Sequence, residues 1–134
     1  IPDGTPLFVR LSCTDWVEGG WNINDSVKLA KLLKKEGVDL IDCSSGGNIS
    51  GVNIPVQPGY QVPFASQIKK EAKILTSAVG LITKYKQAEE ILNNNYADLV
   101  FLGREMLRNP YWAFNAAKKY KESIYYPKQY LRAK

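Results

Sequence analysis

The chain has 134 residues, of which 45% are hydrophobic and 23% charged, a balance that predicts one globular domain without low-complexity or disordered tracts. No apolar run approaches the roughly 20 residues of a membrane-spanning helix, and no signal-peptide pattern opens the sequence, so we expect a soluble, cytoplasmic protein. The net charge of +5 comes mostly from scattered lysines, with a denser group between Lys118 and Lys134; this favours a solvated surface over a nucleic-acid interface.

Histidine is absent and cysteine is scarce. Without histidine the chain lacks the commonest general base and metal ligand, so no metal site is expected. Cys13 and Cys43 fall near the ends of predicted strands, where a small apolar side chain packs well. We therefore favour two reduced core thiols over a disulfide or a nucleophile.

The first half of the chain predicts two strands and two helices. A buried strand over residues 6–11 precedes a glycine-rich loop, and a helix capped by Asn24 or Asp25 ends at Gly37. Apolar residues share one side of this helix: Val27, Ala30, Leu32 and Leu33. A second strand over residues 38–43 leads into a loop over 44–60, which exceeds the usual length of such a connection. Pro63 suits the first turn of the next helix, which ends near residue 73.

The second half continues the alternation. A third strand over residues 74–79 is closed by Gly80, and a helix capped by Thr83 ends among the asparagines at 93–95. Residues 99–102 are apolar without alternation, which is typical of a parallel strand buried on both faces. A helical turn follows at residues 106–107, and Asn109 with Pro110 forms a cap and first-turn pair for a last helix through Tyr120. Residues 126–132 show no periodicity, as in a frayed terminus.

The fourth strand ends in Gly103 and Arg104, at a corner where a helix begins. Glycine lets a ligand approach the backbone, the helix start offers N–H groups, and arginine adds a permanent cation, so this corner suits a phosphate. An ordinary surface corner uses the same residues. On these residues alone, both interpretations stand.

Four strand-then-helix units predict an α/β fold of parallel (βα) units. Two units share the entry pattern of residues 37–40 and 96–99. The candidates are an open doubly wound sheet and a (βα)8 barrel, of which residues 1–134 would form half, since a barrel needs about 250 residues. The notable residues all follow or end strands, where barrels place their ligands, and this favours the half-barrel: Arg10, Ser44-Ser45-Gly46, Gly80 and Gly103-Arg104.

Five segments, matched in order and spacing, resemble one family: LFVRLS at 7–12, GVDLIDCSSG at 37–46, PGYQVPFA at 58–65, AVG at 78–80 and LGRE at 102–105. They resemble the carboxy-terminal half of the Old Yellow Enzyme family, and most closely its bacterial thermophilic-like NAD(P)H-dependent flavin oxidoreductases. The resemblance implies strands five to eight of a TIM barrel that holds FMN. In that family, NADH or NADPH reduces the flavin, and the flavin reduces an activated alkene.

The resemblance also implies roles for individual residues. Arg10 matches an arginine that faces the N1 and O2 region of the flavin and stabilises its reduced state; from the residues alone, it could instead pair with Asp42. Gly80, Gly103 and Arg104 match the FMN phosphate site. Arg132 matches an arginine that crosses a dimer interface to complete the neighbouring substrate pocket, which implies a homo-oligomer.

The family's catalytic residues lie in the first half of the barrel, and none falls in this chain. We therefore expect this half to need an amino-terminal half and to be inactive alone. An alternative of another class is a non-enzymatic half-barrel that self-associates and binds a phosphate-bearing ligand. Dihydroorotate-type and tRNA-dihydrouridine-type FMN barrels share the phosphate corner but lack the Pro-Gly-Tyr-Gln stretch at 58–61, so we rank them lower.

Overall fold

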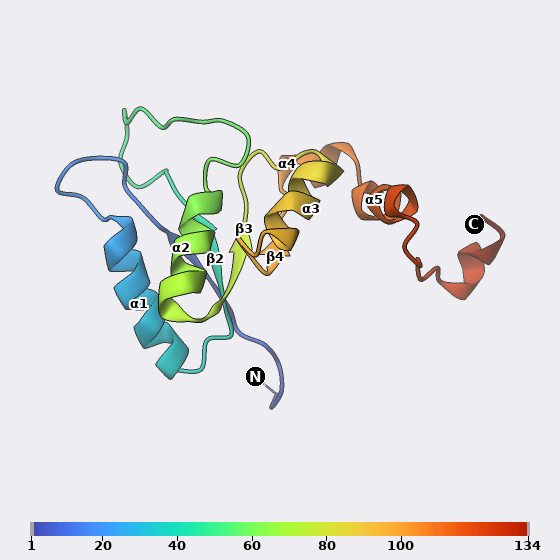
Figure 1. Cartoon of the computed structure of the whole chain (residues 1–134), viewed down its shortest axis with the longest axis horizontal. Coiled ribbons are helices and arrows are strands. Elements are labelled where there is room, and N and C mark those ends of the chain that lie inside the picture. Colours follow the sequence, from blue (N-terminus) through green and yellow to red (C-terminus); the bar gives the residue numbers. More distant parts are fainter. Residues whose placement is uncertain (1, 134) are drawn as a thin grey trace. The chain divides into compact units, whose positions relative to one another are not determined.

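The computed structural model describes residues 2–133, so Ile1 and Lys134, at the ends of the predicted leading loop and basic tail, lie outside the described residues. The chain forms two compact units, Ile1–Leu102 and Gly103–Lys134 (Figure 1). The first unit is an α/β sheet with its helices, and the second is helical. No helix in the described part of the chain is both long and apolar enough to cross a membrane.

A four-stranded parallel sheet forms the centre of the first unit. Its strands β1 (Phe8–Ser12), β2 (Leu40–Ser44), β3 (Leu75–Ala78) and β4 (Leu99–Val100) lie in the order in which they occur in the chain. The helices α1 (Ile23–Lys35), α2 (Val62–Ala72) and α3 (Tyr85–Asn93) connect them in turn (Figure 1). The predicted α/β fold of parallel (βα) units is confirmed, with shifted bounds.

The core lies between the sheet and its helices. Successive side chains of a strand point to opposite faces, and Ile41, Cys43, Thr76 and Ala78 on one face are all 0% exposed. Figure 1 shows α1 and α2 side by side along the sheet. The buried residues Ala30 of α1 and Ile68 of α2 belong to the same core.

The opposite side of the sheet, which we call the open face, is exposed toward the sheet edges and buried at its centre, where Leu40 and Ser77 are 1% and 0% exposed. Phe8, Leu75 and Leu99 lie on it and are 46%, 52% and 40% exposed. The predictions of a buried first strand and of a fourth strand buried on both faces are therefore wrong for this unit. Both strands lie at sheet edges, and the helices cover only one face.

The repeated entry pattern has a structural role. Asp39 accepts the backbone N–H of Leu7 on Oδ2 at 2.8 Å and donates its own N–H to the Leu7 carbonyl. Asp98 does the same with Thr76, where the side-chain bond measures 2.9 Å. Each aspartate thus joins its strand to the preceding one at the point of entry and holds the register.

Three predicted caps are wrong. Asn22, rather than Asn24 or Asp25, caps α1 by accepting the Asn24 N–H at 2.9 Å. Lys84 is the N-cap of α3, and the Thr83 N–H bonds to the Gln87 side chain. In the second unit, the N-cap of the helix Trp112–Tyr120 is Tyr111 rather than the predicted Asn109. Leu32, predicted on the buried side of α1, is 57% exposed.

Cys13 and Cys43 are free and buried, as predicted. A hydrogen bond with the Cys13 thiol and burial raise the pKa of Cys43 far above its ordinary value. Cys43 is therefore a protonated core thiol rather than a nucleophile.

The second unit contains α4 (Arg104–Arg108), α5 (Trp112–Tyr120) and the 3-10 helix η1 (Lys128–Ala133). The tail, expected to lack regular structure, ends in η1, whose start includes the bond from the Tyr130 N–H to the Pro127 carbonyl at 2.8 Å.

Candidate functional site

The open face changes from apolar to polar along the strands. Side chains of register partners on parallel strands point to the same face, so they form rows across the sheet. The row at the amino ends is Phe8, Leu40 and Leu75; the next is Arg10, Asp42, Ser77 and Leu99; the row at the carboxyl ends is Ser12 and Ser44. Polar groups therefore gather toward the carboxyl ends, where open α/β sheets and barrels place their ligands.

Asp42 is the buried carboxylate of this face. It is 9% exposed, and the Ser77 hydroxyl donates a hydrogen bond to its Oδ1 at 2.8 Å. Burial raises the pKa of Asp42 above its ordinary value, and the Ser77 hydrogen bond and the Arg10 charge offset part of that rise. Asp42 thus feels the Arg10 charge from the neighbouring strand.

Arg10 is exposed and lies in register with Asp42. The two residues do not form an ion pair, since none joins them in the described part of the chain. The alternative in which Arg10 serves only as the partner of Asp42 is therefore not supported, and its guanidinium can bind another anion.

Ser12 adds an unsatisfied group beside this pair. Its Oγ is buried and has no hydrogen-bond partner among the described residues, whereas the Ser44 hydroxyl donates to the Leu11 carbonyl at 3.2 Å. Leaving a buried hydroxyl unpaired costs about 1–3 kcal/mol. A ligand or a further segment of protein that bonds to Ser12 would remove that cost, so the open face fits a polar ligand at its carboxyl end.

Gly80 closes β3 at a tightly packed corner. Its φ is +116°, and a Cβ there would lie 2.8 Å from Gln61 Nε2 and 2.9 Å from Tyr60 Cε1. The Gly59 N–H bonds to the Gly80 carbonyl at 2.9 Å, which attaches the long loop to this corner. The fold alone therefore requires glycine here, and a bond from Gly80 to a phosphate stays a prediction.

Gln61 is the site-forming residue that sequence reasoning missed. It is 3% exposed, donates to the Val79 carbonyl at 3.0 Å and accepts from the Ser45 hydroxyl at 2.7 Å. It thereby joins the loops that follow β2 and β3. Its place in the Pro-Gly-Tyr-Gln stretch was the available signal.

In the second unit, Gly103 is the N-cap of α4 and Arg104 is exposed in the first turn. A Cβ at Gly103 would meet nothing within 4 Å, so packing does not explain the glycine. Arg108 pairs with Glu105 at 2.7 Å, whereas no ion pair of Arg104 occurs in the described residues. This corner thus presents an unpaired cation beside a bare stretch of backbone.

Comparison with known proteins decides the family. Residues 2–123 match the NADH:flavin oxidoreductase / NADH oxidase family. The chain belongs to this family.

The similar relatives are bacterial proteins named NADPH dehydrogenase. The chain is 56% identical over 128 residues to the one from Halalkalibacterium halodurans and 55% identical over 128 residues to one from Listeria monocytogenes. Against the one from Geobacillus thermodenitrificans it is 55% identical over 127 residues. These matches cover 95–96% of the chain, and the chain spans 37–38% of the length of the relatives.

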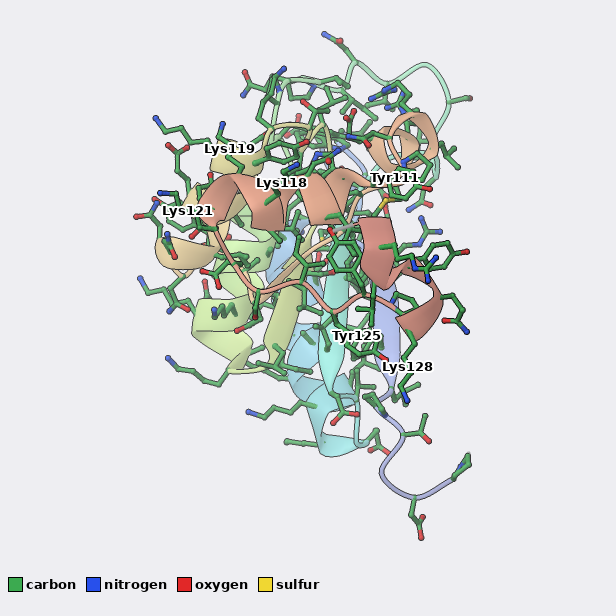
Figure 2. All side chains as sticks on the ribbon, turned by 90° about the vertical axis from the view of Figure 1, so that its right-hand side faces the viewer. Tyr111, Lys118, Lys119, Lys121, Tyr125 and Lys128 are labelled. Atoms are coloured by element: carbon green, nitrogen blue, oxygen red, sulfur yellow. The ribbon has the colours of Figure 1, made fainter. Side chains whose placement is uncertain are left out.

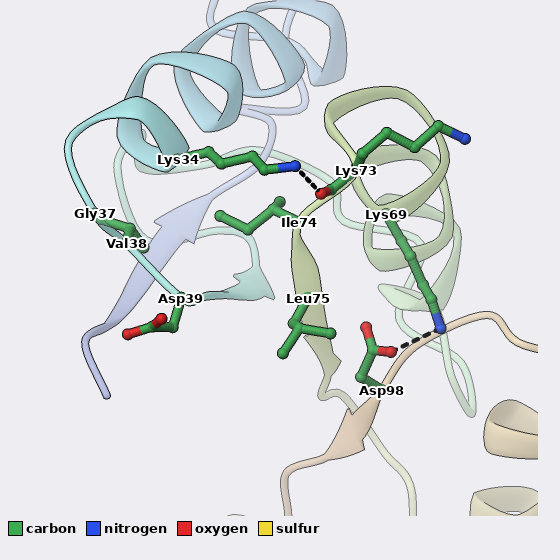
Figure 3. A pocket seen from close by; sticks show the side chains of 9 residues that line it. All are labelled: Lys34, Gly37, Val38, Asp39, Lys69, Lys73, Ile74, Leu75 and Asp98. Carbon is green, nitrogen blue, oxygen red and sulfur yellow. Dashed lines mark hydrogen bonds and ion pairs between the residues drawn. The ribbon is translucent and has the colours of Figure 1, made fainter. Parts of the chain in front are cut away.

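A cavity of about 570 Å³ lies at the other end of the sheet (Figure 3). Two of its lysines have structural partners: Lys34 donates to the Lys73 carbonyl at the end of α2, and Lys69 pairs with Asp98 at 2.9 Å. Cations at helix carboxyl ends stabilise the helix dipole. The cavity therefore lies at the amino ends of the strands, away from Arg10 and Gly80, and its paired lysines stabilise the fold.

Some basic and aromatic side chains of the second unit are labelled in Figure 2: Tyr111, Lys118, Lys119, Lys121, Tyr125 and Lys128. Lys118, Lys119 and Lys121 come from the last turn of α5 and its C-cap, where cations complement the helix dipole. This gives the dense basic stretch a structural reason. Tyr125 is 84% exposed, and Arg132 is exposed within η1.

Proposed function

We propose that this chain supplies the carboxy-terminal half, strands five to eight, of an FMN-dependent (βα)8 barrel that oxidises NADPH and reduces activated alkenes. The observation that carries the proposal is the position of Arg10, an unpaired cation at the polar end of an open sheet face, in a chain of the NADH:flavin oxidoreductase family. We place this enzyme in the cytoplasm.

The sheet supports the half-barrel. A doubly wound sheet reverses its strand order and carries helices on both faces, whereas a barrel adds each strand beside the last with its helices outside. Here the strands run in chain order, and one face is left open. The chain also spans only about 38% of its relatives' length, which leaves room for the other strands in a longer protein.

The residues of the open face fit the proposed cofactor. Bound FMN would supply the hydride chemistry, accepting electrons from NADPH and passing them to the alkene. Arg10 holds a permanent cation where reduction makes the flavin ring negative, and this favours the reduced form. Ser12 offers an unpaired hydroxyl to the same ligand. We assign the FMN phosphate to Gly80, Gly103 and Arg104, whose types suit an anion and match the family's motif.

Two further roles complete the proposal. The residues that orient the alkene and donate a proton would come from the amino-terminal half, because this chain has no histidine and its free thiols are buried. Arg132 would enter the active site of a second subunit in a homo-oligomer. The exposed tyrosines at 125 and 130 are of the kind that anchor such interfaces.

The test for the phosphate site compares two arginines of α4. In the full-length protein, Arg104→Ala should weaken FMN binding roughly 10- to 100-fold, the loss of one charge-assisted hydrogen bond. Arg108→Ala, which removes the arginine already paired with Glu105, should leave FMN affinity within about twofold. Titration of the apoprotein with FMN, followed by flavin fluorescence, measures both. Equal affinities for wild type and Arg104→Ala would overturn the phosphate assignment.

The test for Arg132 is kinetic. Arg132→Ala should raise the KM for the alkene several-fold while leaving FMN content unchanged, because the arginine completes the substrate pocket rather than the cofactor site. A truncation ending at Pro127 should behave alike, and Lys128→Ala in the same tail serves as the control. Wild-type kinetics for the truncation would refute the role of Arg132.

The open face also favours a second candidate, a non-enzymatic half-barrel that self-associates and binds a phosphate-bearing ligand. Its apolar residues Phe8, Leu75 and Leu99 are exposed and would be buried in a dimer. A full-length protein that binds FMN but never oxidises NADPH would favour this candidate.

A further inference from the structure

Asp42 has no task in the function proposed above, yet it is the buried carboxylate nearest in register to Arg10. A buried carboxylate is costly, and hydrophobic or amide side chains would fill the same space more cheaply. Asp42 is 9% exposed, and the structure gives it one hydroxyl partner, Ser77 at 2.8 Å. Its retention in the interior calls for a reason beyond packing.

The geometry relates Asp42 to Arg10 rather than to another cation. Neighbouring parallel strands lie about 4.8 Å apart, and Arg10, Asp42 and Ser77 occupy one row of the open face. The basic side chains in the ion pairs of the described residues are Lys28, Lys69, Lys86 and Arg108, and none of these pairs includes Asp42. Arg10 acts on Asp42 through its charge without forming a direct ion pair.

This arrangement divides two tasks between Arg10 and Asp42. A direct ion pair would occupy the guanidinium and block it from a ligand. A carboxylate one strand away instead cancels part of the charge of the guanidinium and leaves its N–H groups free, while Ser77 keeps the carboxylate in place. The charge of Asp42 thus sets how strongly Arg10 attracts a bound anion.

We propose that Asp42 is a positioning residue that acts through Arg10 and limits how strongly the site favours the reduced over the oxidised flavin. The inference rests on the function proposed above. Without the carboxylate, Arg10 would stabilise the negative reduced ring more strongly. The site would then hold electrons too tightly to pass them on readily.

The experiment uses the full-length holoenzyme and the Asp42→Asn variant, which keeps the side chain's shape and an oxygen for Ser77. The midpoint potential of bound FMN relative to free FMN gives the ratio of the affinities for reduced and oxidised FMN. We expect Asp42→Asn to raise that ratio roughly 4- to 15-fold, as for one charge at about 10 Å with an effective dielectric constant of roughly 20–40. The affinity for oxidised FMN should stay within about threefold, because the oxidised ring is neutral.

Three further variants complete the design. Asp39→Asn makes the same change at the exposed amino end of the strand and should leave the ratio unchanged. Ser77→Ala should shift the ratio in the same direction as Asp42→Asn but less, and it keeps the test decisive if Asp42→Asn folds poorly. In an Arg10→Met background, Asp42→Asn should raise the ratio less than it does with Arg10 present.

The outcomes separate this inference from the proposed function. FMN binding with an unchanged potential in both Asp42→Asn and Ser77→Ala overturns the role of Asp42 and leaves the function standing. An equal shift with and without Arg10 overturns action through Arg10. Failure of the wild-type protein to bind FMN overturns the function and this inference together.

Discussion

Asp39 and Asp98 offer a matched test of what joins the strands of this sheet. Both carboxylates accept a backbone N–H from the preceding strand, at 2.8 Å from Leu7 and 2.9 Å from Thr76. Their surroundings differ, because Leu7 is 39% exposed whereas Thr76 is fully buried. Replacing each aspartate by alanine removes the same bond from two environments.

The expected costs follow from those environments. In Asp98→Ala the N–H of the buried residue Thr76 loses its partner in a partly buried site, which costs about 1–3 kcal/mol, and the half-buried ion pair with Lys69 adds up to about 1 kcal/mol. We therefore expect Asp98→Ala to lower the free energy of unfolding by about 2–4 kcal/mol. In Asp39→Ala water can reach the Leu7 N–H, so the loss should stay below about 1 kcal/mol.

Lys69→Met separates the two contributions at Asp98. It removes the ion pair at 2.9 Å and the bond from Lys69 to the Asn95 side chain but keeps the bond from Thr76, so it should cost about 1 kcal/mol or less. Urea unfolding of the full-length protein, followed by tryptophan fluorescence, compares the three variants at equal m-values. Equal losses for Asp39→Ala and Asp98→Ala would refute the argument from burial, and a Lys69→Met loss as large as that of Asp98→Ala would assign the effect to the ion pair.

Three other predictions concern the corner, the buried carboxylate and the open face. Gly80→Ala should cost about 3–5 kcal/mol through backbone strain and overlap with Gln61, whereas Gly37→Ala, at φ +90° with open space around it, should cost about 1–2 kcal/mol; similar unfolding midpoints would contradict this. Burial raises the pKa of Asp42 in the folded state, so the folded protein binds the proton more tightly, and its stability falls as pH rises above the ordinary aspartate pKa. Asp42→Asn should remove this dependence of stability on pH and be more stable than wild type at pH 7. Unfolding experiments between pH 4 and pH 8 would measure both effects. Residues 1–134 alone should self-associate at micromolar concentration, and a cooperatively folding monomer in sedimentation would count against an open apolar face.

Local patterns in the sequence predicted the order of elements but not their ends. Hydrophobic periodicity and the turn residues placed each strand and helix in the right order. The cap of α1 was misplaced because Asn22, Asn24 and Asp25 are all good N-cap residues, and only the path of the preceding chain selects Asn22. N-cap propensity alone cannot distinguish between nearby residues that are equally good caps.

Contacts between distant segments were beyond sequence reasoning. The repeated Gly-Val-Asp-Leu and Tyr-Ala-Asp-Leu entries were visible, but the purpose of the aspartates depends on which strand lies beside them. Gln61 likewise gains its role from Val79 and Ser45, which lie on other loops. The position of Arg10 was predictable, whereas only the structure showed that no direct ion pair joins it to Asp42 among the described residues.

Some apolar strand residues that the sequence predicts to be buried are exposed in this unit, and their positions indicate where further protein would pack. An apolar residue in a strand predicts a covered position in the complete protein, and residues 99–102 predict cover on both faces. Leu99 is instead 40% exposed in this unit, as are Phe8 and Leu75 to a similar degree on the same face. Beyond Phe8 and Leu75, the polar residues Arg10, Asp42 and Ser77 are not of the kind that an apolar partner would cover. The pattern is therefore apolar where further strands would pack and polar where a ligand would bind, which is the division that the interior of a (βα)8 barrel requires.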